Sequence, residues 1–140
     1  MILVDANIWV YFLDASSKEH ARVKTALPRL LGDDELLMPT VVQMEVIHYV
    51  ARRLGAGAHE VVHTFLTQAG TVEPLTGGLV AEASRLLLAH LATGIGGRDA
   101  AILATAKLHG ATLLTHDQDL ARAAQAMGLR VADPVGTAAP

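Results

Sequence analysis

The chain has 140 residues, of which 51% are hydrophobic and 18% are charged, and it contains no cysteine. This length and composition are typical of one globular domain, and they exclude an intrinsically disordered chain, disulfide bonds and thiolate metal sites. With 11 Lys and Arg against 14 Asp and Glu, the net charge of −3 excludes nucleic-acid binding through overall charge, so any such contact must come from a local patch.

The first element predicted is a short strand over residues 2–4. This continuous apolar run is typical of a strand that is covered on both faces, and it ends at Asp5. Asn7 follows two residues later and is positioned to cap a short apolar helix over residues 8–13. Asp5 alone has two equally plausible roles, as the first residue of a turn or as a ligand at the carboxyl end of a strand.

Two capping-box patterns predict the next helices, one at residues 16–19 and one at residues 40–43. Pro28 is expected to bend or end the first of these helices, and Gly55 and Gly57 to end the second near residue 54. The other expected elements are strands over residues 36–38, 71–75, 111–115 and 129–131, and helices over residues 58–69, 79–91, 98–109 and 117–128.

Short apolar strands therefore alternate with amphipathic helices along the chain. This alternation is typical of a mostly parallel sheet, because parallel strands need crossover connections that place helices on both faces. We predict an α/β fold, a three-layer α/β/α sandwich, as a single domain over residues 1–133. Residues 134–140 are predicted to form a short flexible C-terminal tail.

Four acidic residues lie where the predicted strands end or the predicted helices begin. Asp5 and Asp117 follow two strands, and Glu45 and Asp99 lie near the starts of two helices. In a parallel sheet these positions share one edge, so we expect the four carboxylates to converge. Like charges brought together raise one another's pKa unless a cation neutralises them, and Mg²⁺ or Mn²⁺ prefers oxygen ligands. Each acid has a structural explanation by itself; their convergence is what predicts a metal site.

The segments that carry these acids resemble the four acidic blocks of the PIN domain, and more narrowly those of VapC-type toxins from bacterial and archaeal toxin–antitoxin pairs. The blocks are MILVDANIWV, PTVVQMEVIHYV, GGRDAAILATA and LLTHDQDL, in the expected order over residues 1–131. The resemblance implies a metal-dependent endoribonuclease that uses Mg²⁺ or Mn²⁺. Its catalytic and metal-binding acids carry over to Asp5, Glu45, Asp99 and Asp117. Asp119 is a further candidate ligand, and which of Asp117 and Asp119 lies closer to the metal stays open.

Three other polar residues are expected around this site. Asn7 and Thr115 match positions that are often polar in the family, and we expect them to orient carboxylates or substrate. Arg98, next to Asp99, is positioned to contact a phosphate oxygen. The chemistry agrees with a nuclease, because metal ions activate water and neutralise the charge that develops on a leaving oxygen.

The resemblance also implies an RNA substrate, an inhibitory antitoxin encoded by a neighbouring gene, and a homodimer. Trp9, Tyr11 and Phe12 crowd one short helix, and we expect them either to pack in the core or to line an apolar groove for an antitoxin segment. No apolar run approaches the roughly 18 residues that span a bilayer, and no secretion signal is apparent. A cytoplasmic protein without membrane contact is therefore expected.

Three alternatives compete with the nuclease hypothesis. His59, Glu60 and His63 match the H-E-x-x-H motif of zinc metalloproteases, with Glu82 as a nominal third ligand, but a zinc site there would leave the four acids unexplained. An aspartyl-phosphate enzyme also places an Asp after its first strand, yet it usually has a second acid where this chain has Asn7. A non-catalytic PIN-like interaction module would predict that some of the acids are lost.

Overall fold

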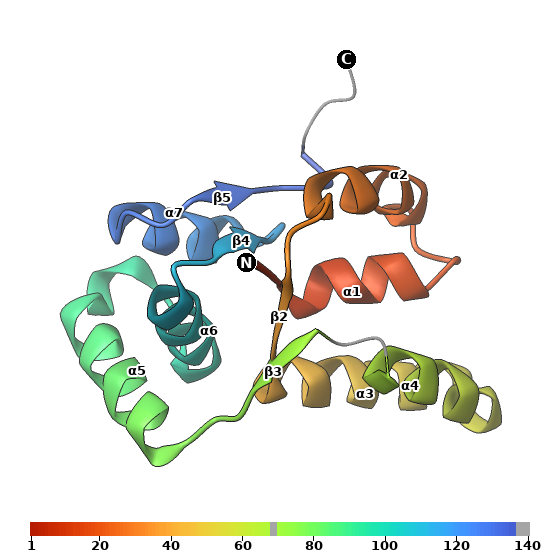
Figure 1. Ribbon diagram of the computed structural model, residues 1–140, viewed down its shortest axis with the longest axis horizontal. Coiled ribbons are helices and arrows are strands. Elements are labelled where there is room, and N and C mark those ends of the chain that lie inside the picture. Colours follow the sequence, from red (N-terminus) through yellow and green to blue (C-terminus); the bar gives the residue numbers. More distant parts are fainter. Residues whose placement is uncertain (68–69, 137–140) are drawn as a thin grey trace.

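The computed structural model describes residues 1–67 and 70–136. In these residues a five-stranded sheet forms the centre of the molecule, and every strand pair in it is parallel (Figure 1). The strands are β1 (Ile2–Val4), β2 (Leu36–Pro39), β3 (Thr71–Glu73), β4 (Thr112–Leu114) and β5 (Val131–Ala132). Their order is β3-β2-β1-β4-β5, so the chain reverses its direction of travel across the sheet between β1 and β4. Such a switch point is where open α/β sheets place their ligands.

The helices are α1 (Ala6–Leu13), α2 (His20–Leu31), α3 (Thr40–Leu54), α4 (Ala58–Thr67), α5 (Gly77–Ala89), α6 (Gly97–His109) and α7 (Gln118–Ala126), with short 3-10 segments η1 (Gly55–Gly57) and η2 (Leu91–Thr93). The predicted helix over residues 58–69 ends at Thr67 in the described part of the chain, and residues 68–69 lie outside it. None of the described helices is long and apolar enough to cross a membrane.

Helices cover both faces of the sheet because the side chains of a strand alternate between its faces. Ile2 and Val4 of β1 pack in one cluster with residues of α1 and α2. Leu3 packs in a larger cluster that contains buried residues of α3, α5 and α6. The predicted three-layer α/β/α sandwich is therefore confirmed, and its mostly parallel sheet is parallel throughout in the described residues.

The first predicted capping box is wrong. Helix α2 begins at His20, after residues 16–19, and its N-cap residue makes no side-chain hydrogen bond. Ser16 donates from its backbone nitrogen and its hydroxyl to Oδ1 of Asp14 at 3.0 and 2.6 Å, so its side chain serves the end of α1 instead. Pro28, which is expected to bend or end this helix, lies inside α2, which continues to Leu31, so the helix does not end there.

The second predicted capping box is wrong for a similar reason. Helix α3 begins at Thr40 itself, with Pro39 as the N-cap residue and no side-chain cap. The Thr40 hydroxyl accepts a hydrogen bond from the backbone nitrogen of Leu75 at 3.0 Å, which ties the start of α3 to the segment that follows β3. The Ser16 hydroxyl bonds to the earlier residue Asp14, and the Thr40 hydroxyl bonds to the distant residue Leu75. Neither side chain therefore caps the helix that its local motif predicts.

The end of α1 is expected to make folding stability sensitive to acid. Hydrogen bonds from the Ser16 and Tyr49 side chains, followed by one from the Ser16 backbone, lower the pKa of Asp14 from 3.8 to about 2. Because the pKa of the folded state lies below that of the unfolded state, this stabilisation is present above about pH 4 and is lost as the pH falls towards 2. We expect the difference in free energy of unfolding between the wild type and Asp14→Asn to shrink over that interval in urea titrations. A difference that stays constant with pH would contradict this.

The C-terminal segment starts well packed. Pro134 and Val135 are buried, and Nη1 of Arg22 in α2 donates to the carbonyl oxygen of Val135 at 3.3 Å. Residues 137–140 of the predicted flexible tail lie outside the described residues. The division into a domain over residues 1–133 and a tail stays a prediction.

Candidate active site

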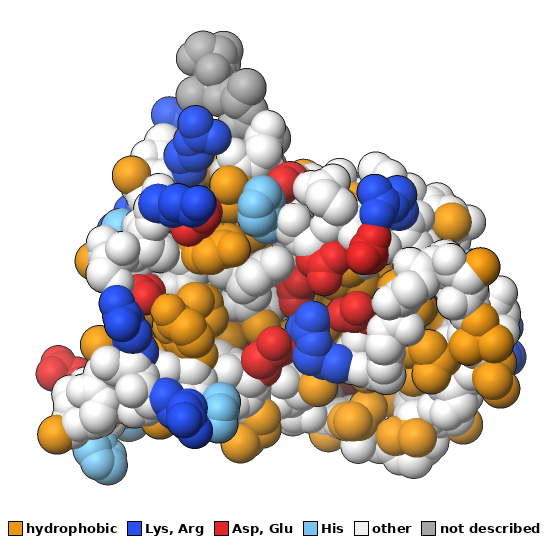
Figure 2. Space-filling view, turned by 180° about the vertical axis from the view of Figure 1, so that it is seen from behind, with side chains coloured by type: hydrophobic (Ala, Val, Ile, Leu, Met, Phe, Trp, Pro, Cys, Tyr) orange, Lys and Arg blue, Asp and Glu red, His pale blue; other side chains and the backbone are white. Residues whose placement is uncertain are grey.

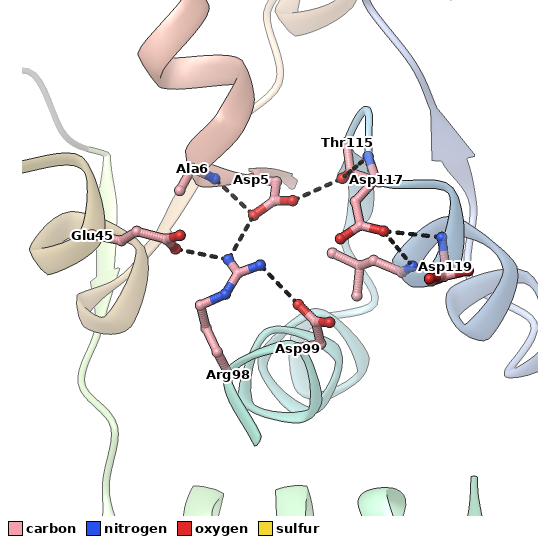
Figure 3. A network of polar contacts seen from close by, with 9 residues as sticks. Asp5, Ala6, Glu45, Arg98, Asp99, Thr115, Asp117 and Asp119 are labelled. Atoms are coloured by element: carbon pink, nitrogen blue, oxygen red, sulfur yellow. Dashed lines mark hydrogen bonds and ion pairs between the residues drawn. The ribbon is translucent and has the colours of Figure 1, made fainter. Parts of the chain in front are cut away.

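The four acids predicted from the sequence lie on different elements, and their side chains meet at the switch point of the sheet. Figure 2 shows acidic side chains gathered on one face of the molecule, with a basic side chain among them. In Figure 3, Asp5 at the end of β1 and the side chains from α3, α6 and the start of α7 point towards one another. The residues brought together there are Asp5, Glu45, Arg98, Asp99, Thr115 and Asp117.

Asp5 is the most buried acid of this group, with 1% of its surface exposed. It is also the N-cap residue of α1, because its Oδ1 accepts a hydrogen bond from the backbone nitrogen of Ala6 at 2.7 Å. Its Oδ2 accepts from the Thr115 hydroxyl at 2.7 Å. The capping role predicted for Asn7 is therefore wrong; Asn7 lies inside α1. Asp5 has its two oxygens fixed by two separate elements.

Thr115 connects Asp5 to the acid at the start of α7. Its Oγ1 donates to Asp5 and accepts from the backbone nitrogen of Asp117 at 3.0 Å. Asp117 caps α7, since its Oδ1 accepts from the backbone nitrogens of Asp119 and Leu120 at 2.9 and 3.1 Å. Asp119 pairs instead with Arg122 on the exposed surface of α7.

Arg98 lies among three of the carboxylates rather than facing solvent. Its Nη1 is 2.7 Å from Oε2 of Glu45 and 3.3 Å from Oδ1 of Asp5, and its Nη2 is 2.9 Å from Oδ1 of Asp99. Burial acts to lower the pKa of the Arg98 guanidinium, but the charges of Asp5, Glu45 and Asp99 together raise it above its ordinary value. The residue predicted to contact phosphate is thus the cation that links three acids.

Asp99 shows that negative charge is crowded in this group. Burial raises the pKa of Asp99; the charge of Arg98 opposes this shift, while the charges of Asp117 and Asp5 add to it. Asp117, the acid that caps α7, thus lies close enough to Asp99 for its charge to act on that carboxyl. A further cation among these carboxylates would be favourable, since each carboxylate disfavours the ionised form of its neighbours.

The donor atoms fit a hard divalent cation. They are carboxylate, hydroxyl and amide oxygens, which Mg²⁺ and Mn²⁺ prefer. Oδ1 of Asn7, in the first turn of the helix that Asp5 caps, is buried without a hydrogen-bond partner among the described residues. Over residues 1–67 and 70–136, no three Asp, Glu or His side chains are arranged to hold a metal as they stand. The guanidinium of Arg98 lies between the carboxylates that would do so.

The predicted zinc motif does not form a site in the described chain. His59, Glu60 and His63 are exposed on α4, and no third acidic or histidine ligand joins them there. Glu82, the nominal third ligand, forms ion pairs with Arg85 at 2.6 Å and with Lys107 at 3.3 Å.

One acid at the same edge of the sheet was missed by the sequence analysis. Asp133 directly follows β5, and its Oδ2 lies 2.8 Å from Nδ1 of His116, whose ring contacts that of Tyr11 edge-on at 6.2 Å between centroids. Burial, followed by the charges of Glu19 and Asp133, raises the pKa of Tyr11. The signal was available in the sequence, because Asp133 follows a strand just as Asp5 does.

A separate apolar groove, which we call the α1/α4 groove, lies between α1, α2 and α4 and has a volume of about 500 Å³. Trp9 packs edge-on against Phe12 and Phe65 at centroid distances of 6.2 and 5.3 Å. The groove is lined by Trp9, Phe12, Leu27, Leu31, Val61 and Phe65, and the polar side chains in its lining are Glu60 and Thr64. Trp9 and Phe12 thus line a groove and also contact the core, whereas Tyr11 lies beside His116.

Solved structures of known proteins resemble the chain in fold. No curated protein is significantly similar to it in sequence. Among solved structures, FitAcB from Neisseria gonorrhoeae is 27% identical with a TM-score of 0.74, covering 96% of this chain and 98% of its own. VapC20 from Mycobacterium tuberculosis, a toxin that cleaves the sarcin–ricin loop, is 22% identical with a TM-score of 0.75, covering 88% of this chain and 95% of its own.

A third neighbour is VapBC2 from Rickettsia felis bound to a promoter DNA fragment, at 19% identity and a TM-score of 0.72, with 95% of this chain and 98% of that chain covered. VapC20 and VapBC2 are less than 25% identical to this chain, so their similarity to it shows a shared fold alone. The PIN domain family matches residues 2–126, which is most of the sequence and includes all four acidic blocks. The chain therefore belongs to the PIN domain family.

Proposed function

We propose that the chain is a metal-dependent endoribonuclease and the toxin of a VapBC-type toxin–antitoxin pair. The observation that carries this proposal is the convergence of Asp5, Glu45, Asp99 and Asp117 beside the switch point of the sheet. Membership in the PIN family and the fold shared with FitAcB and VapC20 support it. An oxygen-rich acidic site is suited to phosphodiester hydrolysis, in which charge develops on phosphate oxygens.

Each residue of the site has a proposed role. Asp5 and Asp99 are the central ligands of an Mg²⁺ or Mn²⁺ ion, and Glu45 and Asp117 complete the ligand set directly or through water. When bound, such an ion supplies a Lewis acid for phosphate oxygens and a more acidic water. Asp117 is assigned this role in place of Asp119, because Asp119 is paired with Arg122 on the surface.

Neighbouring groups keep the ligands in place before any substrate arrives. The Thr115 hydroxyl and the Ala6 backbone nitrogen hold the two oxygens of Asp5 in separate directions. Asn7, in the first turn of α1, has a buried amide oxygen that can accept a hydrogen bond from a metal-bound water or from a substrate hydroxyl. A fixed ligand set lowers the reorganisation that the site must undergo during catalysis.

The test is cleavage of RNA by the purified chain with Mg²⁺ or Mn²⁺, with EDTA, and with the variant Asp99→Asn. We expect cleavage that requires the metal and that Asp99→Asn abolishes. Asp33→Asn, at an exposed loop position away from the acids, is the matched control and retains wild-type cleavage. Cleavage that persists at the wild-type rate in EDTA and in Asp99→Asn would overturn the proposal.

We also propose that the α1/α4 groove receives an apolar segment of a cognate antitoxin. Toxin–antitoxin complexes are found among the structural neighbours, for example one from Klebsiella pneumoniae at 22% identity. An amphipathic helix that docks in a hydrophobic groove is a common mode of recognition, and aromatic residues such as Trp9 and Phe65 are typical anchors. A homodimer and a cytoplasmic location remain predictions of the family resemblance.

Replacing Thr64 by Arg is expected to weaken antitoxin binding by at least tenfold. The new side chain is long and fills space in the groove, and although Glu60 in the lining can pair with it, an apolar segment that docks there would have to bury the charged pair at a cost. His63→Arg adds the same side chain to the same helix outside the groove and serves as the control. The measurement is the affinity of each variant for the protein encoded by the neighbouring gene. Equal affinities of the two variants would place the antitoxin elsewhere.

A further inference from the structure

Arg98 is paired differently from two other arginines of the chain, Arg85 and Arg122. Arg85 and Arg122 each pair with an acid three residues earlier on the exposed surface of their own helix. Arg98 instead forms ion pairs with side chains from β1, α3 and α6. Two nitrogens of a single guanidinium thus contact three of the four acids that we propose as ligands of the divalent cation.

The guanidinium and a divalent cation would compete for the same carboxylate oxygens of Asp5, Glu45 and Asp99, and at close range the two cations repel each other. The guanidinium neutralises negative charge on Asp5, Glu45 and Asp99, as a bound divalent cation would. The Arg98 side chain is 36% exposed and has a long flexible stem, so it has a path into solvent without any change in the fold. Nothing crowds the backbone just before it, since a Cβ atom at Gly96 or Gly97 would meet no atom within 4 Å.

We propose that Arg98 is an internal cation gate, which occupies the acidic site in the metal-free protein and must leave before the divalent cation binds. The inference rests on the metal site of the proposed function and concerns its regulation. Metal binding then has to offset the loss of three ion pairs, and the apparent affinity for the metal is lowered accordingly. The gate also keeps the acids assembled in the metal-free protein, because it links β1, α3 and α6.

The experiment is titration of Mn²⁺ into the full chain without RNA, followed by electron paramagnetic resonance of free Mn²⁺. Arg98→Met keeps much of the side-chain length and removes the charge, and it is expected to bind Mn²⁺ about tenfold more tightly than the wild type. Arg122→Met is the matched control, because it removes a guanidinium that pairs with Asp119 and not with the site acids. We expect its affinity to stay within about twofold of the wild type.

The possible outcomes separate the gate from the metal site itself. If the wild type binds Mn²⁺ and Arg98→Met binds it equally or more weakly, the gate is wrong and the metal site stands. If Arg122→Met tightens binding as much as Arg98→Met, the effect is one of overall charge and the gate is again wrong. If neither the wild type nor Arg98→Met binds Mn²⁺, the metal site and the gate both fail.

Thermal stability gives a second measurement of the same gate. In EDTA, Arg98→Met is expected to melt at a lower temperature than the wild type, because three carboxylates lose their counter-ion. In saturating Mn²⁺ this difference should shrink, since the metal replaces the guanidinium. A difference that is unchanged by Mn²⁺ would contradict the gate. If Arg98→Met does not fold, Arg98→Gln serves instead: it removes the charge but keeps amide donors for the carboxylates, and Mn²⁺ affinity equal to the wild type would overturn the proposal.

Discussion

Replacing Asp5 by Asn is expected to lower the rate of RNA cleavage about a thousandfold, which corresponds to roughly 4 kcal/mol of transition-state stabilisation. The substitution removes the charge of the most buried acid of the site, and with it the ion pair to Arg98, while it keeps the size of the side chain. Asn keeps an Oδ1 that accepts from the Ala6 backbone nitrogen, so the cap of α1 is preserved. The Thr115 hydroxyl can turn to accept a hydrogen bond from the new amide. Loss of activity would therefore report on charge rather than on folding.

The measurement is single-turnover cleavage of RNA in saturating Mn²⁺, together with circular dichroism and thermal melting of each variant. Asp33→Asn makes the same chemical change at an exposed loop position and should cleave at the wild-type rate. Cleavage by Asp5→Asn within about tenfold of the wild type, with the fold intact, would remove Asp5 from the ligand set. Loss of the fold in this variant would show instead that the charge of Asp5 is needed for stability.

The sequence predicts the location of the site because the location follows from topology. Asp5 and Asp117 follow short apolar runs, and such runs become parallel strands whose carboxyl ends meet at one edge. The order in which strands add to the sheet is not needed for that argument. The same argument applies to Asp133 after β5, and it would have placed this acid at the edge as well.

The helix starts were harder to predict because side chains had a choice of partners. Local motifs assign Asn7 to a cap and Thr40 to a capping box, yet Asp5 caps α1 and Thr40 binds the backbone of Leu75. The free energy difference between such arrangements is about 1 kcal/mol, which tertiary contacts readily exceed. A single sequence does not contain the distance between Thr40 and Leu75, so the outcome depends on the fold.

The position of Arg98 could not be read from the sequence for a related reason. Its neighbour Asp99 is adjacent in the chain, but Asp5 and Glu45 lie 93 and 53 positions away. A basic residue beside an acidic site suggests a phosphate contact when only its neighbours in sequence are known. Once the three acids are brought together, the same guanidinium is the nearest available cation, and this position leads to the proposed gate.

Replacing Leu103 by Ala is expected to lower the free energy of unfolding by about 2–5 kcal/mol, a large part of the 5–15 kcal/mol that is typical of a domain. Leu103 lies in the middle of α6, has 0% of its surface exposed and belongs to the larger hydrophobic cluster. Its truncation removes buried apolar surface and leaves a cavity that the surrounding helices fill only in part. The cost is large because Leu103 lies within a run of buried residues, from Ala100 to Ala106, in the middle of α6.

Leu108→Ala is the matched control, because it makes the same change five positions along the same helix, where the side chain is 62% exposed. We expect a change within about 0.5 kcal/mol for this variant, as is usual at exposed positions. Both values come from urea denaturation followed by circular dichroism. Since α6 carries Arg98 and Asp99 in its first turn, cleavage by Leu103→Ala should fall in proportion to the unfolded fraction as temperature rises. A loss of cleavage well below the melting temperature would show instead that the cavity shifts α6 and displaces Asp99 within the site.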